Sequence, residues 1–201
     1  MRKMLLLTAL IVTTHFCLAQ TDTERIKKSI LQSADSMATA FKARDWKTII
    51  HFSPQSVLDM SGGAESLIEM TESVMNQIPA DAIKYFAIGP VVQVVKTEND
   101  WQCIVEQHMT MEINGMRITM MSPLIGQSLN NGASWTFFDS KGDDETARTI
   151  LPGLSSEIIL PKSKQDVVQL YTPPVIKEDK ETAKPEVKKT TVKKPVAVKK
   201  N

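Results

Sequence analysis

The sequence predicts an α+β domain in which N-terminal helices pack on a curved antiparallel sheet. Amphipathic helical spacing dominates the chain before Ile83, and segments of strand-forming residues dominate residues 83–139. The pair Asn114-Gly115 separates two of those segments, and Asn-Gly readily takes the positive φ angles of a two-residue hairpin loop. We therefore expect a long hairpin at the centre of the sheet, with helices covering one face.

Amphipathic spacing predicts three helices and one short extended piece before the sheet. Apolar residues recur every three or four positions through residues 23–41, and one of residues 21–23 is expected to cap that helix. Asp45 should cap the second helix, which ends before Pro54, and Asp143 should cap a later one. The predicted ranges are 23–41, 45–52 and 64–77 for the helices, and 57–60 for the extended piece.

The predicted sheet has four strands and a short edge segment. Their ranges are 85–96, 101–113, 116–125 and 134–138, with the edge segment at 167–171. Alternation gives the second strand two faces. The face expected to point into the core carries Cys103, Val105, Gln107, Met109, Met111 and Ile113. The opposite, mixed face suits either solvent or a homodimer contact, and it carries Ile104, Glu106, His108, Thr110 and Glu112.

The N-terminus has the three-part layout of a secretory signal peptide, which we assign to residues 1–19. A cationic start and a short apolar run lead to small residues, with cleavage expected after Ala19. Acylation of Cys17 is an alternative that the bulky Phe16 before it disfavours. We therefore expect an exported protein, periplasmic or secreted, whose folded domain occupies residues 20–172.

Charge divides the exported chain into an acidic domain and a basic tail. Residues 21–172 hold 13 Lys and Arg against 19 Asp and Glu, a net of −6, whereas residues 173–201 hold 9 Lys against 4 Asp and Glu, a net of +5. The acidic domain lacks a basic surface for phosphates, so we expect no nucleic-acid partner. The Lys- and Pro-rich tail is predicted to be disordered. It serves either as a solubilising terminus or as a weak contact with anionic envelope components.

The composition leaves few candidates for covalent or metal chemistry. Cys103 is the only cysteine after the signal segment, and we expect a buried, inert thiol; a nucleophilic cysteine would need a neighbouring base. His51 and His108 are the only histidines there, and no ligand spacing indicates a metal site or a cofactor. Glu106 and His108 share one strand face, where we expect a hydrogen-bonded surface pair.

Two stretches give the chain a resemblance to a known superfamily. One is Ala-Phe-Lys-Ala-Arg-Asp-Trp at residues 40–46, and the other is Trp-Thr-Phe-Phe-Asp at residues 135–139. Together with the order of helices and strands, they make residues 23–161 similar to the nuclear transport factor 2-like superfamily, a cystatin-like cone. Residues 143–161 also resemble small exported Bacteroidota proteins of unknown function. The resemblance implies a tapered hollow between the helices and the sheet.

Aromatic residues and methionines are expected to line that hollow. The predicted lining residues are Phe41, Trp46, Met109, Met111, Trp135 and Phe137. The methionines around the hairpin either fill the core or line an adaptable pocket. We expect an exported, non-catalytic module that binds a small apolar ligand or a protein partner.

Two other functions stay open. One is a proton-transfer enzyme, of the isomerase or dehydratase type, that acts on a hydrophobic small molecule. Its candidate acid–base groups are His51, Asp59, Tyr85 and Asp139. The other is an envelope-associated scaffold that acts through its basic tail. Fold resemblance cannot choose among these functions, because one fold hosts many activities.

Overall fold

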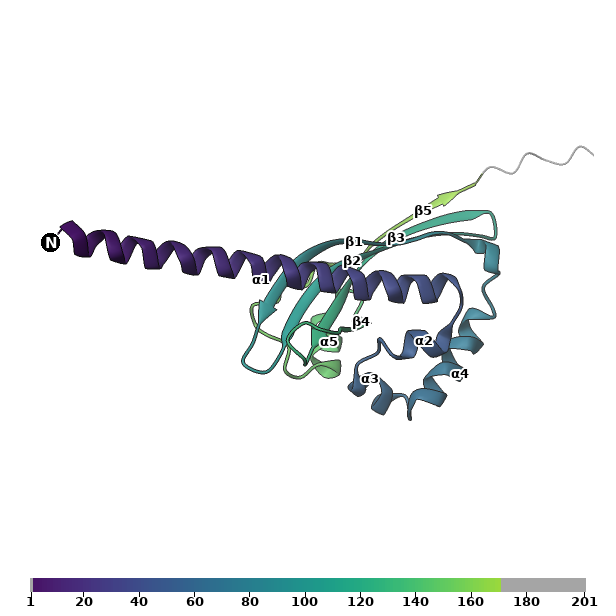
Figure 1. Ribbon diagram of the computed structural model, residues 1–201. Coiled ribbons are helices and arrows are strands. Elements are labelled where there is room, and N and C mark those ends of the chain that lie inside the picture. Colours follow the sequence, from purple (N-terminus) through teal and green to yellow (C-terminus); the bar gives the residue numbers. More distant parts are fainter. Residues whose placement is uncertain (1, 171–201) are drawn as a thin grey trace, which may run out of the picture. The chain divides into compact units, whose positions relative to one another are not determined.

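The computed structural model describes the backbone of residues 2–170 and the side chains of residues 22–170. The helices are α1 (Arg2–Lys42), α2 (Trp46–Ile50), α3 (Gln55–Met60), α4 (Ala64–Met75) and α5 (Asp144–Ile150), with a 3₁₀ turn η1 (Ala80–Ala82) before the sheet. The strands are β1 (Ile83–Lys96), β2 (Trp101–Ile113), β3 (Met116–Ser128), β4 (Thr136–Asp139) and β5 (Lys164–Gln169). The N-terminal helices pack against an open antiparallel sheet (Figure 1), so the predicted α+β class is confirmed.

The sheet is antiparallel, with the strand order β1-β2-β3-β4. β2 and β3 form the long hairpin and pair along their full length. On the other side of β3, β4 pairs with residues 124–127 and β5 pairs with residues 116–121. β4 and β5 therefore share one edge of β3 and leave a gap between them.

The turn between β2 and β3 is the one that the sequence predicts. Asn114 and Gly115 have φ angles of 51° and 71°, the positive values that a two-residue hairpin turn needs. β1 is less regular, because its pairing with β2 shifts around Gly89 and Pro90. Proline lacks the amide hydrogen of a sheet ladder, and an irregular edge strand is where a sheet tolerates it.

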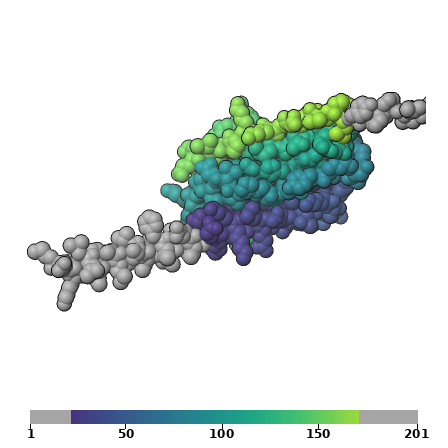
Figure 2. All heavy atoms as spheres, turned by 90° about the horizontal axis from the view of Figure 1, so that it is seen from above, coloured from purple at the N-terminus to yellow at the C-terminus, as the bar shows by residue number. Residues whose placement is uncertain are grey.

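α1 supplies the helical side of a first hydrophobic core, on the face of the sheet that we call the inner face. Ile26, Ile30 and Ala34 follow one another at one-turn spacing and are fully buried. The sheet side of this core consists of Cys103, Val105, Leu124, Trp135 and Phe137. Figure 2 shows α1 along one side of the view and β5 along the opposite side.

A second core lies on the opposite, outer face of the sheet. Ile104 and Ile125 are fully buried there. The residues that cover them come from α5 and the chain after it, and they include Ala147, Leu151, Leu154 and Ile158. The prediction that Ile104 faces solvent or a dimer partner is therefore wrong. Strand alternation indicates which residues share a face, but a segment far along the chain decides whether that face is covered.

Two local predictions are also wrong. Residues 57–60 belong to α3 and not to an extended piece, because Pro54 begins this helix as well as following α2. The Pro54 carbonyl oxygen accepts hydrogen bonds from the amides of Val57 and Leu58. No residue among 21–23 caps a helix start, because α1 runs through these positions.

The other predicted helix caps are confirmed. The Asp45 carboxylate accepts a hydrogen bond from the Thr48 amide at 3.1 Å, and the Asp143 carboxylate accepts one from the Thr146 amide at 2.8 Å. The predicted edge segment is confirmed as β5, although it begins at Lys164, earlier than expected.

The predicted tail, residues 173–201, lies outside the described residues, as do the side chains of the predicted signal peptide. Of the helices that the structure describes, none is both long and apolar enough to span a membrane.

Candidate ligand-binding site

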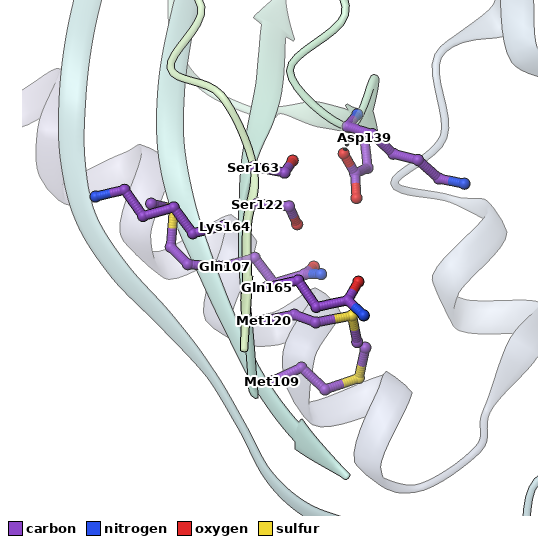
Figure 3. Close-up of a pocket in the computed structure, with 10 residues that line it drawn as sticks. Gln107, Met109, Met120, Ser122, Asp139, Ser163, Lys164 and Gln165 are labelled. Atoms are coloured by element: carbon purple, nitrogen blue, oxygen red, sulfur yellow. Dashed lines mark hydrogen bonds between the residues drawn. The ribbon is translucent and has the colours of Figure 1, made fainter. Parts of the chain in front are cut away.

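The candidate site lies on the inner face of the sheet, at the gap between β4 and β5. Ser122 and Pro123 of β3 fall between the two paired stretches. A hollow of about 410 Å³ opens there (Figure 3). Its lining residues are Gln107, Met109, Met120, Met121, Ser122, Asp139, Lys141, Ser163, Lys164 and Gln165.

A glycine turn brings the two sides of this hollow together. After β4 the chain turns at Lys141 and Gly142, both with positive φ. A Cβ atom at Gly142 would lie 2.6 Å from the Pro161 carbonyl oxygen, so only glycine allows this close approach. The contact holds the turn after β4 against the chain that enters β5. As a result, Asp139 and Ser163 stand on neighbouring sides of the hollow (Figure 3).

Polar groups gather at one end of the hollow. The Asp139 carboxylate points into it (Figure 3), and its Oδ1 accepts a hydrogen bond from the Lys141 amide at 2.6 Å. The Gln107 and Gln165 amides lie side by side below it, with the Ser122 hydroxyl nearby. Within the described part of the chain, the second oxygen of Asp139 and these three side chains have no hydrogen-bond partner.

Apolar groups dominate the other end. Met109 and Met120 are paired across β2 and β3 and lie next to each other in the hollow (Figure 3). A second hollow of about 230 Å³ adjoins the first, since Gln107, Met109 and Asp139 line both. The other residues of the second hollow are apolar: Met37, Phe41, Ile49, Phe86, Leu124, Phe137 and Phe138.

Three of the six predicted pocket residues line the hollows. Phe41, Met109 and Phe137 line the second one, and the Phe41 ring stacks on Phe86 with 4.3 Å between centroids. The remaining three lie nearby but line neither hollow. Trp46 is buried edge-on against Phe41, Trp135 is buried in the first core, and Met111 lies one inner-face position closer to the hairpin turn than Met109.

The structure does not bring together His51, Asp59 and Tyr85, the residues considered for proton transfer. His51 follows α2 and is exposed, Asp59 is exposed and accepts a hydrogen bond from Gln55, and Tyr85 is 55% exposed on β1. None of the three lines either hollow. Asp139, the fourth candidate, is the carboxylate that does.

Glu106 and His108 form the predicted pair on the outer face, away from the hollows. His108 Nε2 lies 3.0 Å from Glu106 Oε2, and both side chains are partly exposed. A Cβ atom at Gly89 would lie 2.7 Å from His108 Nε2, so the irregular part of β1 makes room for the imidazole.

The single cysteine of the folded part is buried, as predicted. Cys103 is fully buried in the first core. Burial raises the pKa of its thiol, and a hydrogen bond from the Gly126 backbone offsets this only in part. The thiol therefore stays protonated at neutral pH and does not act as a nucleophile.

Apart from Asp139, the sequence does not place the polar residues of the site. The sequence predicts Gln107 only as a core-face residue, and Gln165 lies before the predicted edge segment. One signal was available: Gln107 interrupts an otherwise apolar strand face, and a lone amide there indicates a place where the core opens.

Comparison with known proteins does not identify a family. The chain matches no protein-family model, and no curated protein matches it in sequence. Among the described residues, no three or more His, Cys, Asp or Glu side chains are grouped so that they could hold a metal ion.

Proposed function

We propose that the protein is an exported, non-catalytic module of the nuclear transport factor 2-like superfamily that binds a small, largely apolar ligand on the inner face of its sheet. The observation that carries the proposal is that Gln107, Met109 and Asp139 line two hollows at once. The hollows therefore adjoin and offer one ligand both a polar and an apolar wall. The helices-on-sheet arrangement and the predicted signal peptide are consistent with the superfamily and with export.

The size and lining of the hollows support a small molecule as the ligand. The larger hollow, about 410 Å³, falls within the range of about 300–1,000 Å³ that is usual for small-molecule sites. Methionine side chains are flexible and polarisable, so Met109 and Met120 can adapt to an apolar surface. The stacked rings of Phe41 and Phe86 add a rigid apolar wall.

The placement of the ionisable groups supports binding over proton transfer. A general base has to lie within hydrogen-bond reach of the proton that it abstracts. His51, Asp59 and Tyr85 are exposed and line neither hollow. Asp139 does line them, but it is exposed, and the other polar groups of the hollow are amides, hydroxyls and the two lysines Lys141 and Lys164. This environment suits the recognition of a polar head group.

The proposal is tested by mass spectrometry of small molecules that stay bound when the protein is isolated from its own cells. Met109→Trp should block the junction of the two hollows, because the larger side chain fills the shared space. Met60→Trp is the matched control, since Met60 is 64% exposed at the end of α3. We expect the native protein and Met60→Trp to carry the same molecule and Met109→Trp to lose it.

Circular dichroism has to show that both tryptophan variants keep the fold. Equal loading of a folded Met109→Trp variant would contradict the proposed site. The absence of any bound small molecule from the native protein would count against the ligand-binding function itself.

A further inference from the structure

We propose that the ligand is an amphipathic amine, with its protonated head group against Asp139 and its apolar chain over Met109 toward Phe41 and Phe86. This inference rests on the proposed ligand-binding function and adds the chemical class of the ligand. It follows from the acceptors left free at one end of the hollow and from the apolar lining of the other.

The polar end supplies the acceptors that an ammonium group requires. An ammonium has three donors and no acceptor. The Asp139 carboxylate faces the hollow (Figure 3), and its second oxygen is free of partners among the described residues, as are the carbonyl oxygens of the Gln107 and Gln165 side chains. The charged oxygen of Asp139 and the two neutral amide oxygens provide three acceptors. They match the three N–H donors and the positive charge of an ammonium.

Two lysines, Lys141 and Lys164, also line the hollow, and among the described residues neither forms an ion pair with Asp139. Lys164 extends away from the hollow in Figure 3. Lys141 contacts Asp139 through its backbone amide, and no ion pair joins the two side chains in the part of the chain described here. The carboxylate thus keeps its charge available for a ligand, and it would repel a carboxylate head group at the same position.

The apolar end of the hollow determines the direction in which the ligand's alkyl chain lies. Phe86 is paired with Met109 across β1 and β2, and its ring is stacked on Phe41 of α1. A ligand whose head group lies at Asp139 therefore runs its alkyl chain past Met109 to these two rings in the second hollow. An alkyl chain gains from this burial whatever its head group is. The head group alone should decide the order of affinities within a series of equal chain length.

The test uses three ligands with the same chain: octylamine, octanol and octanoate. Their dissociation constants are measured for the full chain by isothermal titration calorimetry at pH 7. Octylamine should bind about fivefold more tightly than octanol, the effect of one partly exposed ion pair, and octanoate should bind most weakly. Asp139→Asn keeps the acceptor for the Lys141 amide and removes the charge, so it should abolish the preference for octylamine over octanol.

Asp59→Asn is the matched control, because Asp59 is an exposed carboxylate outside both hollows. It should leave all three affinities unchanged. If the three ligands bind equally to the native chain and Asp139→Asn changes nothing, the head-group inference is overturned, while loss of their binding in Met109→Trp would still support the proposed function. If none of the three binds, the head-group inference fails, while the molecules bound to the native protein still decide the ligand-binding function. If octanoate binds most tightly, an anionic ligand replaces the amine.

Discussion

Gln102 binds the segment that covers the second core, α5 and the residues after it, to the sheet. Replacing Gln102 with leucine should weaken this attachment. The Gln102 side chain is fully buried. Its amide nitrogen donates to the Gly153 carbonyl oxygen at 2.8 Å and to the Asp100 carboxylate at 3.1 Å, and its amide oxygen accepts from the Ser155 amide at 2.8 Å. Leucine has a similar volume but can make none of these hydrogen bonds. Gln102→Leu therefore leaves one backbone acceptor and one backbone donor of the covering segment without partners, while Asp100 keeps its hydrogen bond from Gln127.

The expected loss in the free energy of unfolding can be compared with that of a matched control variant, Gln93→Leu. A buried backbone group without a partner costs about 1–3 kcal/mol, and since Gly153 is exposed and its carbonyl can regain water, Gln102→Leu should cost about 2–4 kcal/mol. Gln93 holds the same segment by donating to the Glu157 carbonyl oxygen and accepting from the Ile159 amide, but these bonds are exposed. Gln93→Leu should therefore cost only about 0–1 kcal/mol.

Urea unfolding followed by tryptophan fluorescence measures both variants. The chain has three tryptophans, and two of them, Trp46 and Trp135, are buried in the folded protein. The midpoint should fall at an unchanged slope, which would indicate a loss of stability without a change in the surface exposed on unfolding. In thermal melts the same loss should lower the midpoint by roughly 5–15 °C. A Gln102→Leu stability within about 0.5 kcal/mol of Gln93→Leu would refute the assigned role of Gln102.

Two further substitutions test the first core and a helix cap. Gly126→Ala should lower the free energy of unfolding by about 1–3 kcal/mol in the same urea assay, because the alanine Cβ would lie 2.5 Å from Cys103 Sγ. The control is Gly153→Ala, whose Cβ meets nothing within 4 Å. Equal losses in the two variants would contradict this reasoning. The Thr48 hydroxyl and then its amide hold the pKa of Asp45 below its ordinary value of 3.8. The stabilisation from this carboxylate is therefore complete above that value and is lost as the pH falls through the lowered pKa. Asp45→Asn should remove this part of the acid sensitivity, whereas parallel acid-unfolding curves for the two proteins, recorded by circular dichroism, would argue against it.

The turn and two helix caps, which depend on local chemistry, are predicted correctly, whereas the exposure of Ile104 is not, because a distant segment covers it. Asn114 and Gly115 determine the hairpin through their own backbone preferences. Asp45 and Asp143 cap helices through amides three residues ahead. The prediction for residues 57–60 is wrong because Pro54 does more than end the preceding helix: it also begins α3.

The candidate site was only half predicted, for a related reason. Phe41, Met109 and Phe137 could be placed in the hollow because helix and strand periodicity indicates which side chains face inward. Gln165 could not be placed there, because its position depends on the register between β5 and β3, and β5 consists entirely of exposed residues. Such a strand has no alternating apolar face for sequence analysis to detect.

One stretch of chain builds both the cover of the outer face and a wall of the inner hollow. After Asp139 the chain turns at Gly142, covers the outer face with α5 and residues 151–158, and returns past Gly142 to form β5. The carboxylate proposed to bind the ligand also orders this turn, through the hydrogen bond from the Lys141 amide. Asp139→Asn separates the two roles, because the asparagine carbonyl oxygen can keep that hydrogen bond while the charge is lost. A loss of amine preference without a loss of stability in that variant would therefore assign the charge to the ligand and the hydrogen bond to the fold.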